Sequence, residues 1–296
     1  MSQAHILVGA TDKPARPAIR RVTLADLKDV LAKGRADFAA MPSHAVFLCV
    51  IYPMIGVLIA ALTFGYSILP LLYPMAAGFA LVGPLAAICL YELSRRREAG
   101  ENPDSIQGLD VLRSRSMDAI LALGVLLLLI FAVWVAIANA IYVANFGYAS
   151  PESLTQFIHD LFNTTAGWNL VILGNGVGFL FAVLVLAISV VSFPLLIDRD
   201  VGVAVAVSTS VRAVMANPVT MAVWGLIVAV LLLLGSLPIF LGLTVVLPVL
   251  GHATWHLYRK AVDPGPAPRV EHVTPPKGHR YAAEFPASLF PGGRHE

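Results

Sequence analysis

Charged side chains are scarce in this chain of 296 residues. Asp, Glu, Lys and Arg make up 13% of it and hydrophobic residues 58%, a balance that excludes an ordinary soluble globular protein. Cysteine is scarcer still, because only Cys49 and Cys89 are present and each lies inside an apolar run. A fold built on disulfides is therefore not expected.

Catalytic motifs are also missing from the sequence. It contains no nucleophile elbow, no phosphate-binding P-loop, no HExxH pair and no Rossmann fingerprint. Outside the apolar runs, no segment is long enough to bury the core of an independent enzymatic domain. No basic patch is interleaved with base-stacking aromatic residues. We therefore expect neither an enzyme nor a nucleic-acid-binding protein.

Long apolar runs dominate what is present. Six of them approach or exceed the roughly 20 residues that a helix needs to cross a membrane. They cover residues 44–66, 68–92, 117–145, 167–193, 219–236 and 238–258. The predicted fold is all-α, a polytopic membrane protein with six transmembrane helices and amphipathic helices on its cytoplasmic face. Its predicted parts are an N-terminal segment (1–43), a transmembrane domain (44–260) and a Pro-rich, disordered tail (261–296).

The positions of Lys and Arg predict the orientation of these spans. All twenty lie before the first run, between the second and third, between the fourth and fifth, or after the sixth. Lys and Arg near spans are retained on the cytoplasmic side, so both termini are expected in the cytoplasm. A cationic inner face also favours contact with anionic membrane lipids.

The middle of each predicted span lacks ionisable residues. Asn139, Asn175 and scattered Ser and Thr are the polar interruptions there. A carrier that moves charge usually places ionisable groups at this depth. Their absence weighs against a proton-coupled carrier, and it leaves open a passage for a neutral or lipidic molecule.

A surface helix is predicted to begin after Thr23. Thr23 and Asp26 have the spacing of a capping box. Apolar residues then recur at near-helical spacing, at Leu24, Leu27, Leu31 and Phe38. Such a helix would lie in the inner membrane interface with its apolar face down, or pack against a soluble partner. Two further surface segments are expected at 105–116 and 201–216, the second as an interfacial helix, because an open strand edge cannot face lipid.

The second and sixth runs share a spaced pattern of residues. Seven positions agree at a constant offset of 164, from Pro74 and Pro238 to Arg96 and Lys260. This agreement predicts a parallel internal repeat of a hairpin. Paired prolines in each run predict kinks, which can open a cavity between the two helices.

Small residues mark the fourth run. Gly174 and Gly178 have the spacing that lets two helices approach closely, and Asn175 lies between them. Packing inside the bundle and formation of a homo-oligomer are both open interpretations of this face.

Polar residues gather at the cytoplasmic edge of the spans. His252, His256 and Arg259 share one helical face, and the repeat predicts contact between Glu92 and His256. Imidazoles one turn apart can bind a transition metal, so His252 and His256 are candidate metal ligands, with Glu92, Cys49 and Cys89 as further candidates. The alternative is a structural role, with these histidines hydrogen-bonded to lipid headgroups or carbonyl groups.

Two stretches resemble a known family. They are PMAAGFALVGP at 74–84, continued by YELSRR at 91–96, and GHATWHLYR at 251–259. Together they resemble the bacterial integral membrane proteins of domain-of-unknown-function family 2189 (DUF2189), over about residues 20–262. The resemblance implies a location in the inner membrane of a Gram-negative cell, and it implies no activity or cofactor.

Three functions remain open from the sequence. The first is a non-enzymatic scaffold or accessory protein that binds protein partners through its inner face and tail. The second is a binder or carrier of a neutral or lipidic small molecule. The third is a metal- or haem-binding accessory protein of a respiratory complex.

Overall fold

The computed structural model describes residues 17–41, 69–81, 83–101, 103, 105–148, 151, 153–238, 241–263, 265 and 269–270. Over these residues the chain is helical apart from one short pair of strands, as the all-α prediction requires. The helices are α2 (Leu24–Ala40), α4 (Leu72–Leu81), α5 (Gly83–Ala86), α6 (Ile88–Glu98), α7 (Met117–Phe146), α8 (Leu154–Asn163), α9 (Thr165–Ser189), α10 (Ser192–Asp198), α11 (Gly202–Ala216), α12 (Pro218–Ser236) and α13 (Leu243–Ala261). Two 3-10 helices, η1 (Leu69–Leu71) and η2 (Ser105–Arg113), and strands β1 (Ala18–Ile19) and β2 (Val262–Asp263) complete the set.

Three segments are long and apolar enough to cross a membrane. They are Met117–Phe146, Thr165–Asp198 and Pro218–Ser236. They coincide with the third, fourth and fifth predicted runs. Large apolar side chains on α7, α9 and α12 stay exposed, such as Leu129, Phe179 and Leu233, each at least 60% accessible. Such exposure is what helices that face lipid require.

The described residues do not show the six predicted spans. The predicted first run, 44–66, lies outside the described residues. The second run, 68–92, contains η1, α4, α5 and the start of α6, with a turn at Ala87 between α5 and α6. The sixth run forms part of α13, which is continuous despite Pro248 and is absent from the three candidate spans.

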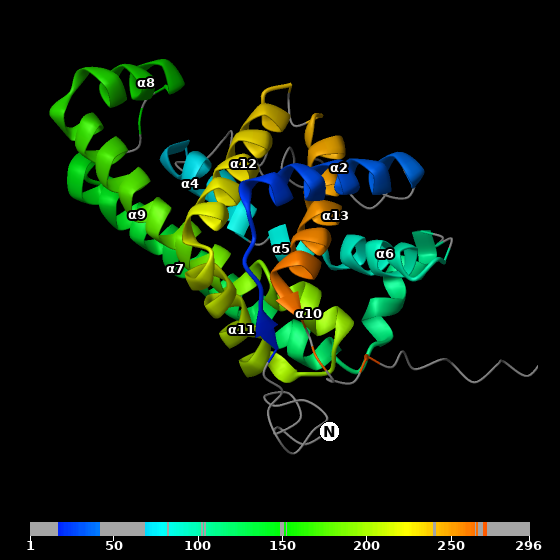
Figure 1. The fold of residues 1–296 in the computed structure, drawn as a ribbon. Helices are drawn as coiled ribbons and strands as arrows, with labels where there is room; N and C mark the ends of the chain where they lie inside the picture. The colour runs from blue at the N-terminus through cyan, green and yellow to red at the C-terminus, as the bar shows by residue number, and fades with distance from the viewer. Residues whose placement is uncertain are drawn as a thin grey trace, which may run out of the picture.

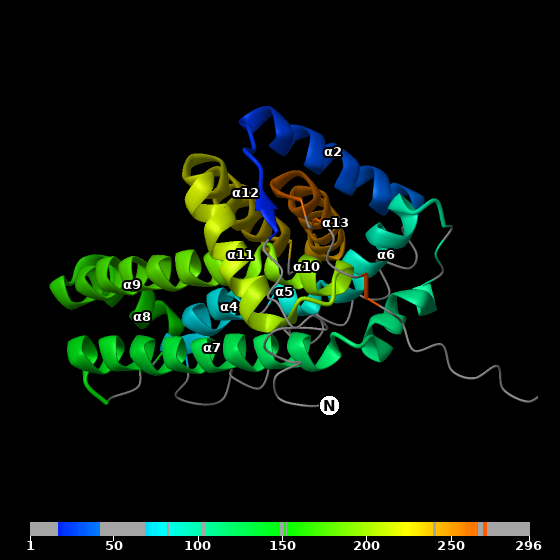
Figure 2. The same ribbon diagram turned by 60° about the horizontal axis from the view of Figure 1, so that its bottom comes forward.

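Helices α7 and α9 lie side by side as a hairpin (Figure 1). Helix α8 closes one end of this hairpin, where Phe157 packs against Tyr142 and Phe146 of α7. Helices α10 and α11 lie toward the opposite end, and α2 and α13 lie on the side of the molecule away from α7 (Figure 2).

Helix α2 begins with the predicted capping box. Thr23 Oγ1 accepts from the backbone N–H of Asp26, and the Asp26 carboxylate accepts from the backbone N–H of Thr23. Part of its apolar face is covered by α13, a neighbour that the prediction did not name. Leu27 and Val30 are buried there. A Cβ added at Gly34 would lie 2.7 Å from both Cβ of Ala253 and the Val249 carbonyl oxygen, so the two backbones nearly touch.

The segment before α2 is fixed to distant parts of the chain. Strand β1 pairs antiparallel with β2, directly after α13. The Asn217 side chain accepts from the Val22 N–H at 2.8 Å and donates to the Arg20 carbonyl at 3.1 Å. Asn217 also lies at the junction of α11 and α12. Helix α11 forms the segment at 201–216 that was predicted to be helical.

The proposed repeat agrees with burial at the C-terminal end of each run. Leu93 and Leu257 are both fully buried, and Tyr91 and Trp255 are nearly so. The two copies nevertheless differ in form, since one is broken and the other continuous. They also pack closely: a Cβ added at Gly251 would lie 2.6 Å from a Leu90 methyl carbon, so the predicted cavity has no room at this level.

Candidate functional site

A buried carboxylate lies where α2, α6 and α13 meet. The Asp37 side chain is 8% exposed. It accepts from Ser94 Oγ at 2.7 Å, from His256 Nε2 at 2.9 Å, and from Arg97. A buried charge is tolerated only when it is paired and hydrogen-bonded, and this one joins all three helices.

The partners of Asp37 keep it ionised. Burial works to raise the pKa of Asp37, but the hydrogen bonds from His256 and Ser94 hold that pKa below its ordinary value. The helices set this geometry, because Ser94 and Arg97 are three residues apart on α6 and therefore share one face.

His252 is bound to the same group through Ser94. Its Nδ1 lies 2.7 Å from Ser94 Oγ. Because the single hydroxyl proton of Ser94 is donated to Asp37, Nδ1 of His252 must carry the proton of this contact. Nε2 then carries a lone pair, and it is buried without a hydrogen-bond partner in the part of the chain that the structure describes.

Two of the predicted metal ligands, His256 and Glu92, are bonded to other side chains. His256 bonds to Asp37 instead of Glu92. Glu92 is fully buried and accepts a bidentate pair of bonds from Arg95, at 2.8 and 2.7 Å, and a third from Arg96 at 2.6 Å. Cys89 is a half-buried free thiol, and Cys49 lies outside the described residues.

Metal binding can be tested against the described residues as a group. They contain no cluster of three or more His, Cys, Asp or Glu arranged to hold a metal ion. His252 Nε2 is a buried ring nitrogen without a hydrogen-bond partner among the described residues, and an unprotonated ring nitrogen is the form in which imidazole binds a metal. The predicted contact between Glu92 and His256 is wrong, since each side chain is paired elsewhere.

The rest of the polar face of α13 is paired in the same way. Tyr258 donates to Asp198 of α10 at 2.7 Å, and Trp255 donates to Glu98 of α6 at 2.9 Å. Lys260 lies 2.7 Å from Asp26 on α2. The helix therefore bonds to three neighbours through successive turns.

Sequence reasoning missed the acidic half of this network. The stripe of His252, His256 and Arg259 was visible, but its partners Asp37 and Asp198 were not singled out. Only the pattern of acids on α2 offered a signal, because Asp26, Asp29 and Asp37 are acidic residues on an otherwise basic and apolar helix.

A comparison with known protein families tests the predicted resemblance to DUF2189. Residues 71–198 match the DUF2189 family model, described as a predicted integral membrane protein. The chain is similar to DUF2189 over this part, which is less than half of its length. The stretches at 74–84 and 91–96 lie inside the match, whereas the stretch at 251–259 lies beyond it. No curated protein and no solved structure matches the chain.

The DUF2189 part and the network overlap only in part. Glu92, Ser94, Arg97 and Asp198 lie within the matched residues. Helices α2 and α13, which supply Asp37 and both histidines, lie outside them. The family description gives membrane location and no activity, so the chemistry must be argued from the network itself.

Proposed function

We propose that this protein is a non-enzymatic scaffold of the bacterial inner membrane, with both termini in the cytoplasm and the joined helices α2, α6 and α13 on the cytoplasmic face. We call these three helices the cap. One observation carries the proposal: the buried carboxylate of Asp37 on α2 is bonded to side chains of α6 and α13 rather than facing an open site. Such a network fixes a surface in one shape, and that is what a docking protein needs.

The ionisable groups of the cap support a structural role. Glu92 is saturated by Arg95 and Arg96, and Asp198 accepts from Tyr258. A general acid or base must instead reach a substrate atom. Groups already engaged inside the protein stabilise the fold.

The outward face of α2 indicates the kind of partner. Lys28 and Arg35 are exposed and seven residues apart, so they lie on one face, with the exposed Leu24 one turn before Lys28. Cations around an apolar residue complement an acidic protein surface. We therefore assign α2 an acidic protein partner.

Co-purification tests this assignment. The full-length protein is extracted gently from its own membranes, and partner stoichiometry is measured by native mass spectrometry. Lys28→Glu/Arg35→Glu should remove a partner that the wild type retains in stoichiometric amount. Arg113→Glu/Arg269→Glu makes the same charge change at exposed sites outside α2 and should retain it. A bare homo-oligomer from the wild type, or equal retention by both variants, contradicts the proposal.

Metal binding is a second candidate, favoured by the unpartnered Nε2 of His252. A metal bound there would need further ligands from residues that the structure does not describe. Cys49 is the candidate ligand that the sequence supplies. Metal content measured on the purified protein should fall in His252→Ala/His256→Ala if a metal is bound. Equal content in wild type and variant ends this alternative.

A further inference from the structure

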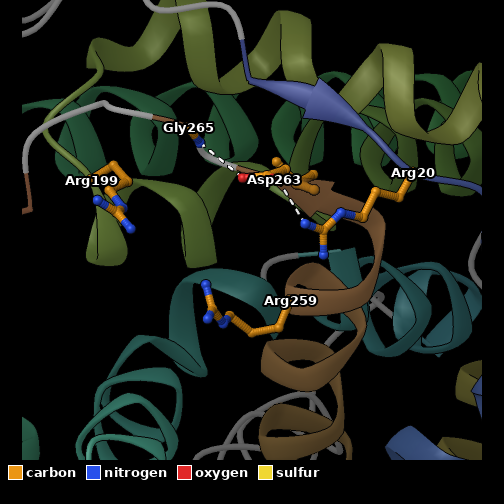
Figure 3. A pocket seen from close by; sticks show the side chains of 6 residues that line it. Arg20, Arg199, Arg259, Asp263 and Gly265 are labelled. Atoms are coloured by element: carbon orange, nitrogen blue, oxygen red, sulfur yellow. Dashed lines mark hydrogen bonds and ion pairs between the residues drawn. The ribbon is translucent and has the colours of Figure 1, made fainter.

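Three arginines from distant parts of the chain line one small pocket (Figure 3). The pocket has a volume of about 180 Å³. Its lining consists of Arg20, Arg199, Arg259, Val262, Asp263 and Gly265. A cavity of this size holds several water molecules, each with a share of about 30 Å³, and therefore also a group the size of phosphate.

The fold brings these arginines together through backbone pairing. Arg20 directly follows β1, and its backbone N–H donates to the Ala261 carbonyl at 2.8 Å, at the end of α13. Arg259 lies in the last turn of the same helix, and Arg199 directly follows α10. The positions therefore depend on main-chain contacts and not on the side chains alone.

Carboxylates at the edge of the pocket hold each guanidinium. Arg20 lies 2.6 Å from Asp263, and Arg199 Nε lies 3.2 Å from Asp198. Arg259 Nε lies 3.0 Å from Glu98, with Asp198 at 3.7 Å from its Nη1. A guanidinium carries five N–H donors, and for Arg20 and Arg259 these contacts engage only some of them.

Each guanidinium at the pocket is paired with a carboxylate: Arg20 with Asp263, Arg199 with Asp198 and Arg259 with Glu98. Of these three carboxylates only Asp263 belongs to the lining, so the pocket wall itself presents more guanidinium than carboxylate groups. Guanidinium matches phosphate oxygens through pairs of parallel hydrogen bonds.

We propose that this pocket binds a phosphate group, carried by an anionic phospholipid headgroup or free as inorganic phosphate. Arg20 and Arg259 supply the donors, and Arg199 adds its charge to the lining. Asp263 and Glu98 act as positioning residues that hold the arginines. The site is independent of the partner surface on α2, so either proposal can fail without the other.

Two measurements on the full-length protein distinguish the sources of phosphate. In the first, nanodiscs of phosphatidylglycerol and phosphatidylethanolamine are used, and retained lipid is counted by native mass spectrometry. In the second, the thermal midpoint in detergent is followed during titration with inorganic phosphate, against chloride at equal ionic strength. The variants are Arg199→Gln/Arg259→Gln and, at the more exposed position, Arg20→Gln. Arg113→Gln/Arg212→Gln is the control, with the same loss of charge at exposed sites outside both the pocket and α2.

Retention of phosphatidylglycerol by wild type and control, lost in the pocket variants, assigns a lipid headgroup. A phosphate-dependent rise in the midpoint that the pocket variants lose assigns free phosphate, with affinity roughly tenfold weaker for each arginine removed. If the double variant does not fold, Arg20→Gln decides between these results. Wild type that responds in neither measurement, or pocket variants that behave as the control does, overturns the proposal.

Discussion

Asp37 and His256 lie 219 positions apart in sequence, and their side chains meet at 2.9 Å. This contact joins the last turn of α2 to the middle of the polar half of α13. The same carboxylate reaches α6 through Ser94 and Arg97, so removing it affects three helices at once.

Asp37→Asn should therefore destabilise the protein strongly. The substitution leaves Arg97 and His256 without their anion, and breaking a buried ion pair costs about 3–5 kcal/mol. Asp29→Asn is the matched control, because Asp29 is 43% exposed and its pairs with Lys33 and Lys260 are worth about 0–1 kcal/mol. Unfolding midpoints in mixed detergent micelles measure both. Equal losses for the two variants would show that Asp37 is not the centre of the network.

Gly34→Ala should separate α2 from α13. The new Cβ would lie 2.7 Å from backbone atoms of Ala253 and Val249, which cannot turn aside as a side chain can. Overpacking of this kind costs about 1–3 kcal/mol. Gly174→Ala has nothing within 4 Å of its new Cβ and should be neutral or slightly stabilising. Unfolding of both variants, followed as above, tests this, and a neutral Gly34→Ala contradicts the close approach.

The pairs of Lys260 with Asp26 and Asp29 predict loss of stability at both extremes of pH. Hydrogen bonds with Lys260 lower the pKa of both carboxyls below 3.8, and those carboxylates raise the pKa of Lys260 above 10.5. The stabilisation that the two carboxylates provide is present above pH 3.8 and is lost as the pH falls through their lowered pKa values. The stabilisation that the Lys260 ammonium provides is present below pH 10.5 and is lost as the pH rises through its raised pKa.

Unfolding midpoints measured across pH should show this in the wild type and less in Lys260→Met. Because the groups are partly exposed, the difference should be about 1 kcal/mol or less. Identical pH profiles for the two proteins would contradict the pairing.

His252 should be a neutral imidazole with its proton on Nδ1. Ser94 enforces this form, because its own proton is given to Asp37. Nitrogen NMR of labelled histidine distinguishes a protonated from an unprotonated ring nitrogen. Ser94→Ala removes the constraint and should shift His252 toward the form protonated at Nε2, with a loss of about 1–3 kcal/mol in stability. Protonated Nε2 in the wild type would contradict the assignment.

Hydrophobic length and local capping predicted part of this fold well. The runs at 117–145 and 219–236 are α7 and α12, and the capping box of Thr23 and Asp26 is present. These features depend on residues close in sequence. The second run was predicted as one kinked span, and the turn at Ala87 that separates α5 from α6 was not expected.

The partners of each helix could not be predicted. The apolar face of α2 predicts that this face is covered. The same spacing of apolar residues is expected whether lipid, a partner protein or α13 covers it. The hydropathy of residues 238–258 likewise does not show that α2 and α6 cover the second half of this run. Asp37 and His256 are too far apart in sequence for any local rule to pair them, and the same holds for Arg20, Arg199 and Arg259.

Carbodiimide coupling in native membranes tests most directly whether the cap is closed. This reagent joins an amine to a carboxylate only when the two are in contact. The structure places Lys260 Nζ 2.7 Å from Asp26 and 2.9 Å from Asp29, so digestion and mass spectrometry should recover amide cross-links from Lys260 to α2. The exposed Lys28 serves as the internal comparison within the same helix. Recovery of Lys260 unmodified, or joined only to residues outside α2, would contradict a cap formed by α2, α6 and α13.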